Sequence, residues 1–411
     1  VSFLYYSAGA TVVLNDVLQL PASIDLAKFR ASYAKVGNSI RAFATNQPAY
    51  TQNPNTGGLV KGTQSSFPGR PLKPEDNRSL EFGTEWRFLN NRIGIDVTYY
   101  KNDNYDQYFE TPAPAASGFT TYFLNLGHIQ NKGWEVMLNA VPVKGRDFEW
   151  STAVNFATNK NTVVNLSAEG INSSGGTPQF ILSTFDNTYG TVVRQGGSFG
   201  DIISYVALRD DKGNLVLDNT KGTPLPDRQQ PTRQVVGNPN PDFTAGWSNT
   251  IRYKKLSLNF LFDGRFGGEV MSLTQAELDL KGFSKKSVEA REAGGVFVRG
   301  IKQNGTAFEG TVSAKDYYGA IGGRDGIGEY YIYDATAIRL REVSLSYVVP
   351  VKWKGIRELN VSLVGHNLFF VKREAPFDPE VSMSTGNRLQ GIDAFGLPST
   401  RSFGVNVKVG F

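Results

Sequence analysis

Apolar and polar side chains alternate along much of the chain with a period of two. In the segment 400–411 every second residue from Phe403 onward is apolar, and the residues between them are polar or small. The apolar members are Phe403, Val405, Val407, Val409 and Phe411. A β-strand sends successive side chains to opposite faces, so this segment predicts a strand with one apolar and one polar face.

The same alternation recurs in segments that are separated by two kinds of connection. It is found in 80–88, 93–99, 134–140, 148–156, 256–262, 343–349 and 359–363. The turns near Asn90, Lys144, Lys254 and 352–355 are short, whereas the connections over approximately 37–78, 161–243 and 264–333 are long and rich in Gly, Ser, Asn and Pro. Short turns on one side and long loops on the other are typical of outer-membrane barrels. The chain is therefore predicted to be all-β, a portion of an antiparallel transmembrane β-barrel.

The two faces of the predicted strands have different chemistry. Charged residues recur on the alternate face: Glu81, Glu85, Arg87, Arg92, Asp96, Glu135, Glu149 and Asp263. In a membrane barrel this face lines a water-filled lumen, and the apolar face, including the closing strand 403–411, contacts lipid. The alternative from the pattern alone is a soluble protein in which the apolar face of an antiparallel sheet forms the core.

The predicted strands are too few for a complete transporter barrel. About ten or eleven can be counted at ~10 residues each, the length that crosses a bilayer at a tilt. Residues 1–6 would form an open edge, which lipid does not tolerate, so we expect the other barrel half upstream of Val1. Residues 272–293 depart from the alternation and predict one or two short helices, with Thr274 and Glu277 at capping-box spacing. No run of 18 apolar residues predicts a membrane-spanning helix.

Composition argues against several kinds of chemistry. The 411 residues include 43 Lys+Arg and 38 Asp+Glu, and the resulting net charge of +5 is too weak to indicate nucleic acid as a partner. There is no cysteine, and the histidines are His128 and His366. No phosphate-binding loop, nucleophile elbow or HExxH motif occurs, so neither an enzyme nor a cofactor is expected. The acidic segment 209–218 has too few regularly spaced oxygens for calcium, and we expect an ordinary turn and no metal. His366 falls on the polar side and is predicted to be a hydrogen-bonded lumen residue.

Several motifs resemble one family of membrane proteins. They are KFRASYAKVGN (28–38), LKPEDNRSLEFGTEWRFLNNRIGIDVTYYK (72–101), NKGWE (131–135), GNPNPDF (237–243), IRLREVSLSY (338–347), GHNL (365–368), FDPEV (377–381) and PSTRSFGVNVKVGF (398–411). Their order over nearly the whole chain resembles the SusC/RagA family of TonB-dependent outer-membrane transporters.

This resemblance implies a fold, a function and partners. The fold would be about half of a 22-stranded barrel, its C-terminal part, and the N-terminal plug domain would be absent from this chain. The function would be import of large nutrients, oligosaccharides or peptides, across the outer membrane of a Bacteroidetes-type bacterium. The partners would be a SusD-like surface lipoprotein and, through the absent region, the TonB complex.

The long loops contain aromatic residues that could contact a substrate. The candidates are Phe119, Tyr122, Phe123, Tyr189, Tyr317, Tyr318, Tyr330 and Tyr331. Aromatic rings stack on sugars and also pack against peptide side chains, so they do not select a substrate. Packing within the loops, or docking to the lipoprotein, explains each of them equally well. For the whole chain, the alternative functions are a soluble or surface-exposed β-rich glycan-binding or adhesin module and, less favoured, a β-rich polysaccharide-degrading enzyme.

Overall fold

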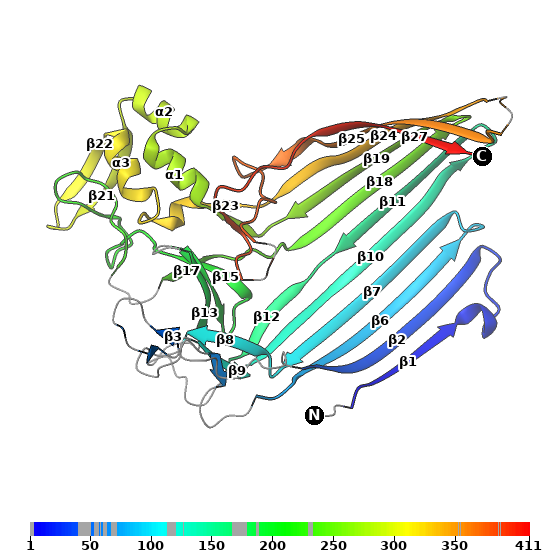
Figure 1. The fold of residues 1–411 in the computed structure, drawn as a ribbon, viewed down its shortest axis with the longest axis horizontal. Helices are drawn as coiled ribbons and strands as arrows, with labels where there is room; N and C mark the ends of the chain where they lie inside the picture. The colour runs from blue at the N-terminus through cyan, green and yellow to red at the C-terminus, as the bar shows by residue number, and fades with distance from the viewer. Residues whose placement is uncertain are drawn as a thin grey trace.

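The computed structural model describes residues 4–39, 51–52, 57, 59–60, 64–66, 72–112, 121–125, 127–166, 179–185, 189–228, 233–351, 353, 355–384, 386 and 388–411. Strands predominate. One large curved sheet extends along the molecule, and the α-helices and several smaller sheets gather beyond one of its ends (Figure 1).

The large sheet, termed the wall, is antiparallel between neighbouring strands. Its described strands follow the order β1 (Tyr6–Val13), β2 (Ile24–Asn38), β6 (Glu75–Phe88), β7 (Ile93–Tyr105), β10 (His128–Lys144), β11 (Phe148–Ala157), β18 (Phe243–Tyr253), β19 (Leu256–Phe266), β24 (Ala337–Val349), β25 (Glu358–Arg373) and β27 (Ser402–Gly410). A further strand, β12 (Lys160–Asn165), pairs with β10. β1 and β27 are the two edges of this sheet, so the wall is an open portion of a barrel. The predicted antiparallel barrel portion is confirmed.

The two ends of the wall differ in the length of their connections. Residues 89–92, 145–147 and 254–255 join neighbouring strands at the turn end. Leu89, Asn90 and Asn91 have φ values of 57°, 58° and 58°, in the left-handed region that asparagine tolerates better than most side chains. The long connections leave from the opposite end, termed the loop end (Figure 1). The predicted separation of short turns from long loops is confirmed.

The strand register gives the wall two distinct faces. On the outer face Tyr99 lies opposite both Phe82 and Trp134, and Phe82 and Trp134 are each 50% exposed. On the inner face Glu85 lies opposite Asp96. The outer face therefore presents large apolar side chains to the surroundings, while the inner face presents charges.

The segments beyond the loop end form a second region, termed the loop assembly. Its larger sheets contain β13 (Gln179–Phe185), β14 (Tyr189–Arg194), β15 (Phe199–Ser204) and β17 (Gln234–Gly237); β16 (Val216–Leu217), β21 (Val296–Lys302) and β22 (Ala307–Val312); and β20 (Glu269–Ser272), β23 (Ile332–Asp334) and β26 (Ile392–Asp393). Its helices are α1 (Leu273–Lys281), α2 (Lys285–Glu292), α3 (Ala314–Ile321) and the short η3 (Gly328–Tyr331). The remaining short elements of the chain are η1 (Leu14–Asp16), β3 (Thr51–Gln52), β4 (Leu59–Val60), β5 (Gln64–Ser66), β8 (Tyr108–Pro112) and β9 (Thr121–Asn125). The main apolar core of the loop assembly contains side chains that are 0% exposed, among them Tyr189, Met271, Leu273 and Ile327.

Residues 272–293 form two helices, as predicted, but the predicted cap is wrong by two residues. The N-cap of α1 is Ser272, whose hydroxyl accepts a hydrogen bond from the Gln275 N–H at 3.0 Å. Thr274 already lies in the first turn, and its hydroxyl accepts from the Phe395 N–H at 2.7 Å. The helix starts earlier because β20 delivers the chain directly to Ser272. Within the described residues, none of the helices is long and apolar enough to span a membrane.

Candidate functional site

The inner face of the wall carries paired charges along neighbouring strands. The Arg30 guanidinium donates to both Asp96 oxygens, at 2.9 and 2.8 Å, and Lys28 pairs with Glu85. The Arg30 and Asp96 side chains are 36% and 33% exposed, so solvent screens them and the pair contributes little to stability. These pairs make the inner face a polar, hydrated surface.

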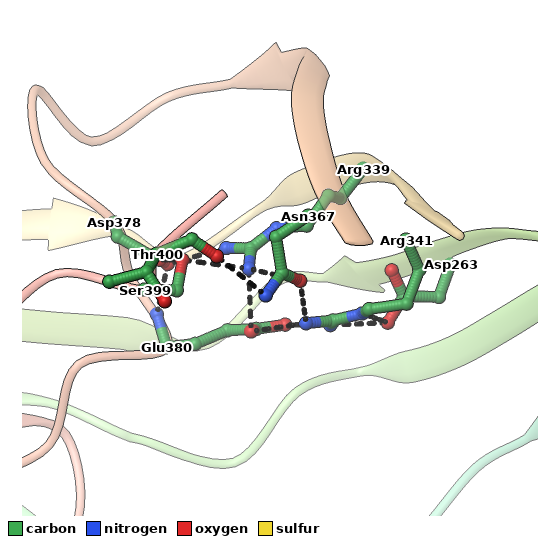
Figure 2. A network of polar contacts seen from close by, with 8 residues as sticks. All are labelled: Asp263, Arg339, Arg341, Asn367, Asp378, Glu380, Ser399 and Thr400. Carbon is green, nitrogen blue, oxygen red and sulfur yellow. Dashed lines mark hydrogen bonds and ion pairs between the residues drawn. The ribbon is translucent and has the colours of Figure 1, made fainter. Parts of the chain in front are cut away.

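A denser network lies where the inner face meets the loop assembly (Figure 2). Arg339 on β24 has a side chain only 3% exposed, and its Nη2 donates to Asp378 Oδ1 at 2.7 Å. Its Nη1 donates to Ser399 Oγ at 3.0 Å, and Ser399 in turn donates to Asp378. The guanidinium also lies 4.2 Å from the centre of the Phe370 ring. A buried charge is tolerated only when it is paired in this way.

Arg341 forms the second half of the network. Its Nε donates to Asp263 Oδ2 at 2.9 Å, and its Nη2 donates to Glu380 Oε1 at 2.6 Å. Its Nη1 donates to Asn367 Oδ1 at 3.2 Å, and Asn367 Nδ2 donates to the Thr400 carbonyl at 3.2 Å. Leu340 and Glu342 pair with the consecutive residues Phe262 and Leu261 of β19, so Arg341 is an extra residue of β24 relative to that strand, and such a bulge can redirect a side chain.

The network fastens the connection between β25 and β27, residues 374–401, to the inner face. Burial alone would raise the pKa of Asp378, but hydrogen bonds from Ser399 and the Glu380 N–H, together with the charge of Arg339, outweigh it and lower that pKa. Asp378 is therefore ionised at neutral pH. The sequence prediction did not select these residues, although the motifs 338–347, 365–368, 377–381 and 398–411 all contribute to the network.

A pocket of about 240 Å³ lies near the junction of β7, β10 and β12. Amide side chains make up most of its lining: Asn104, Gln107, Asn131, Asn159, Asn161, Asn240 and Gln390. Ile129 and Phe199 add apolar surface, and no charged residue of the described chain lines it. Amide groups both donate and accept hydrogen bonds, so the pocket suits neutral polar groups such as sugar hydroxyls or peptide units.

The structure divides the predicted aromatic substrate contacts into two groups. Tyr122 and Phe123 are 6% and 1% exposed on β9. Tyr189, Tyr318 and Tyr331 lie buried in the main core of the loop assembly, with Tyr317 and Tyr330 half-buried against it. Phe119 lies outside the described residues. Burial raises the pKa of both Tyr318 and Tyr330 to about 12. Their rings thus shape the loop assembly, and their contact with substrate stays a prediction.

The predicted lipid-facing residues of the closing strand are all accessible, four of them on β27 and Phe411 directly after it. Phe403, Val405, Val407, Val409 and Phe411 are 76%, 67%, 56%, 38% and 81% exposed. β27 is an edge strand, and all its residues from Ser402 to Val409 are exposed whichever face they occupy. Contact with lipid stays a prediction for these five residues.

The remaining polar candidates have local roles. Asp210 accepts hydrogen bonds from the N–H groups of Lys212 and Asn214 at 2.9 and 2.8 Å, which closes a turn. His366 lies opposite Glu342, with Nδ1 at 3.6 Å from Oε2, longer than a hydrogen bond. Within the described residues, no three His, Cys, Asp or Glu side chains gather closely enough to hold a metal ion.

Comparison with known proteins gives one family. A model of the TonB-dependent receptor-like β-barrel matches residues 2–339. TonB-dependent receptor P3 of Formosa agariphila is 27% identical over 99% of this chain, which covers 42% of that protein. TonB-dependent receptor SusC of Bacteroides thetaiotaomicron is 24% identical over 83% of this chain and 32% of its own length. The chain thus spans less than half the length of these relatives.

The fold is also found among solved structures. The RagAB peptide importer in its closed-closed state superposes with a TM-score of 0.72 over 99% of this chain and 43% of that chain, at 20% identity. At that identity the superposition shows a shared fold.

Proposed function

The chain belongs to the TonB-dependent receptor β-barrel family, and we propose that it forms the C-terminal part of the barrel of an outer-membrane transporter. The transporter imports large nutrients, oligosaccharides or peptides, with energy supplied through TonB. The observation that carries this proposal is the family match over most of a wall that has an apolar outer face and a charged inner face. Lipid covers the outer face, and the inner face lines the path of the substrate.

The plug and the segment that TonB grips belong to the part of the transporter outside this chain. Relatives of more than twice its length support this division. Passage of substrate then requires displacement of the plug from the lumen. The residues described here supply the lumen wall, the pocket lined by amides and the loops above them.

The partner in this proposal is a SusD-like surface lipoprotein that covers the loop end. The relative named SusC and the shared fold with the RagAB peptide importer support it. The half-buried Tyr317 and Tyr330 are on the loop assembly, which would face both lipoprotein and substrate. The pocket lined by amides favours a neutral polar cargo, which includes both oligosaccharides and peptide backbones.

The test uses the full-length protein in its own bacterium. Deletion of its gene should abolish uptake of one class of fluorescently labelled oligosaccharide or peptide, and the intact gene should restore uptake only when TonB is functional. The protein should fractionate with the outer membrane and require detergent for extraction. Recovery in the soluble fraction would refute the barrel role. Ligand capture that persists without uptake and without dependence on TonB would instead favour the glycan-binding or adhesin alternative.

A further inference from the structure

Three lysines line up across neighbouring strands on the outer face of the wall, at its loop end. Lys132 on β10 lies directly opposite Lys101 on β7 and also directly opposite Lys160 on β12. Like charges at opposite positions destabilise a sheet. Lys101 is compensated by Asp103, with Nζ 3.1 Å from Oδ2. In the described part of the chain, no acidic group pairs with Lys132 or Lys160.

A row of aromatic side chains lies next to these lysines on the same face. Two residues along each strand toward the turn end, Tyr99 faces Trp134 with ring centroids 5.0 Å apart, and Phe82 lies opposite Tyr99. At a membrane surface aromatic rings occupy the headgroup level, and lysines beyond them attract anionic headgroups. The order of the two rows therefore matches the order of layers in a lipid leaflet.

Two hollows meet at this aromatic row. An apolar groove of about 530 Å³ follows the outer face, with Ala10 and Ala31 between larger residues such as Phe29. A second, more polar hollow of about 620 Å³ contains Lys132, Lys160 and several amides, including Asn159 and Asn238. Tyr99 and Trp134 line both hollows. One molecule with an apolar tail and an anionic head could therefore occupy both.

We propose that these two hollows bind a phosphorylated glycolipid of the outer leaflet. An acyl chain lies in the groove, a phosphate lies between Lys132 and Lys160, and the sugar hydroxyls contact Asn238. Lysine binds phosphate as a point charge, and Asp242, the one carboxylate among the described residues of the polar hollow, leaves the two lysines in excess. This inference rests on the proposed membrane location of the wall, and neither Lys132 nor Lys160 lines the pocket of amides assigned to the cargo.

The experiment compares two lipids that differ only in phosphate. The full-length transporter is placed in phosphatidylcholine nanodiscs that contain either bisphosphorylated lipid A or its dephosphorylated form at the same mole fraction. Native mass spectrometry measures the lipid retained. The phosphorylated form should be retained at least about tenfold better, since charge-assisted hydrogen bonds supply the difference. K132Q/K160Q should remove this preference, K132R/K160R should keep it, and A10F, which fills the groove, should lower retention of both lipids.

A matched control is K144Q/K255Q, which removes two lysines from the turn end of the same wall and should retain lipid as the unmodified protein does. Equal retention of the two lipids, or full retention by K132Q/K160Q, would overturn the lipid site. These outcomes are distinct from failure of the proposed function. A protein that inserts and imports its cargo without selecting the phosphorylated lipid refutes only the lipid site, whereas one recovered in the soluble fraction refutes the membrane location and the lipid site with it.

Discussion

The wall and the loop assembly place their apolar side chains in opposite environments. In the loop assembly, Tyr189, Met271 and Leu273 are 0% exposed, as in the core of any water-soluble domain. In the wall, Trp134 is 50% exposed and Leu363 58%, and the wall is a single sheet layer. The loop assembly can therefore be stabilised in water by its own packing, whereas the proposed membrane location supplies an apolar solvent to the outer face of the wall.

The two regions are joined by the network of Arg339 and Arg341. Both arginines come from β24 of the wall, and their partners Asp378 and Glu380 come from the connection 374–401, which also provides β26 to the loop assembly. The charged inner face is thus a docking surface for the loops as well as the predicted lining of a channel. The following variants test whether the wall and the loop assembly unfold separately, and whether their exposed side chains contact different solvents.

The largest effect is expected when Arg339 is removed from the network that connects the two regions. Arg339→Met leaves the Asp378 carboxylate buried without its cation, which should destabilise the docked loop by about 3–5 kcal/mol. Limited proteolysis of the full-length protein in detergent should then cut within 374–401. Lys372→Met is the control, because Lys372 forms an exposed pair with Glu374, which solvent screens. Equal protease resistance of the two variants would show that the network does not hold the loop.

A cavity in the loop assembly should weaken that region alone. Leu273 is 0% exposed, and Leu273→Ala should cost about 2–5 kcal/mol. Hydrogen exchange should accelerate in α1, α3 and β20 while amides of the wall keep their protection. Leu278→Ala, at a residue 37% exposed on the same helix, should have a smaller effect. If exchange in β6 and β7 accelerated as well, the two regions would form one cooperative unit and the comparison would fail.

Charges placed on equally accessible residues should distinguish the solvents of the two regions. Val407 in the wall is 56% exposed and Phe297 in the loop assembly 64%. Val407→Arg should reduce the stability of the protein in lipid vesicles, by an amount that rises with depth to about 2–4 kcal/mol at the bilayer midplane. Phe297→Arg, in water, should change stability by no more than about 0.5 kcal/mol. Urea unfolding from vesicles measures both, and a small effect at both sites would place the outer face in water.

A small and local effect is expected at a helix cap. Ser284 caps α2, and its hydroxyl accepts from the Ser287 N–H at 3.0 Å. Ser284→Ala should destabilise the helix locally by about 1 kcal/mol, and Ser284→Gly by a few tenths. Exchange rates of the α2 amides measure the change. Faster exchange in Ser284→Gly than in Ser284→Ala would contradict a capping role.

The network that holds the connection 374–401 to the wall should weaken only at low pH. The pKa of Asp378 is lowered from its ordinary value of 3.8, so its ionised form stabilises the folded state above that value. The stabilisation is lost as pH falls through the lowered pKa. Cleavage within 374–401 by an acid-active protease should therefore increase only below about pH 4. Release of the loop between pH 5 and 7 would point to a different titrating group.

The sequence by itself determined the strands of the wall, its short turns and its two faces. These features are local, because the pleat alternates side chains whatever the strand pairs with, and residues such as Asn90 favour a turn on their own. The ordered set of motifs, which includes 338–347 and 377–381, also indicated the family. The pattern could not show which residues of those motifs contact one another, since Arg339 and Asp378 meet only through a loop that folds back.

Only the tertiary structure decided which polar and aromatic residues share a site. Lys101, Lys132 and Lys160 become neighbours through the exact pairing of three strands, which a shift of one residue would abolish. The sequence left open whether Tyr189 and Tyr331 contact substrate or pack within the loops. The structure buries both in the main core of the loop assembly, because connections of this length can fold on themselves and form a core. Alternation is set by the backbone of each strand, whereas contacts between distant segments depend on register and on chain reversal, which the local pattern does not contain.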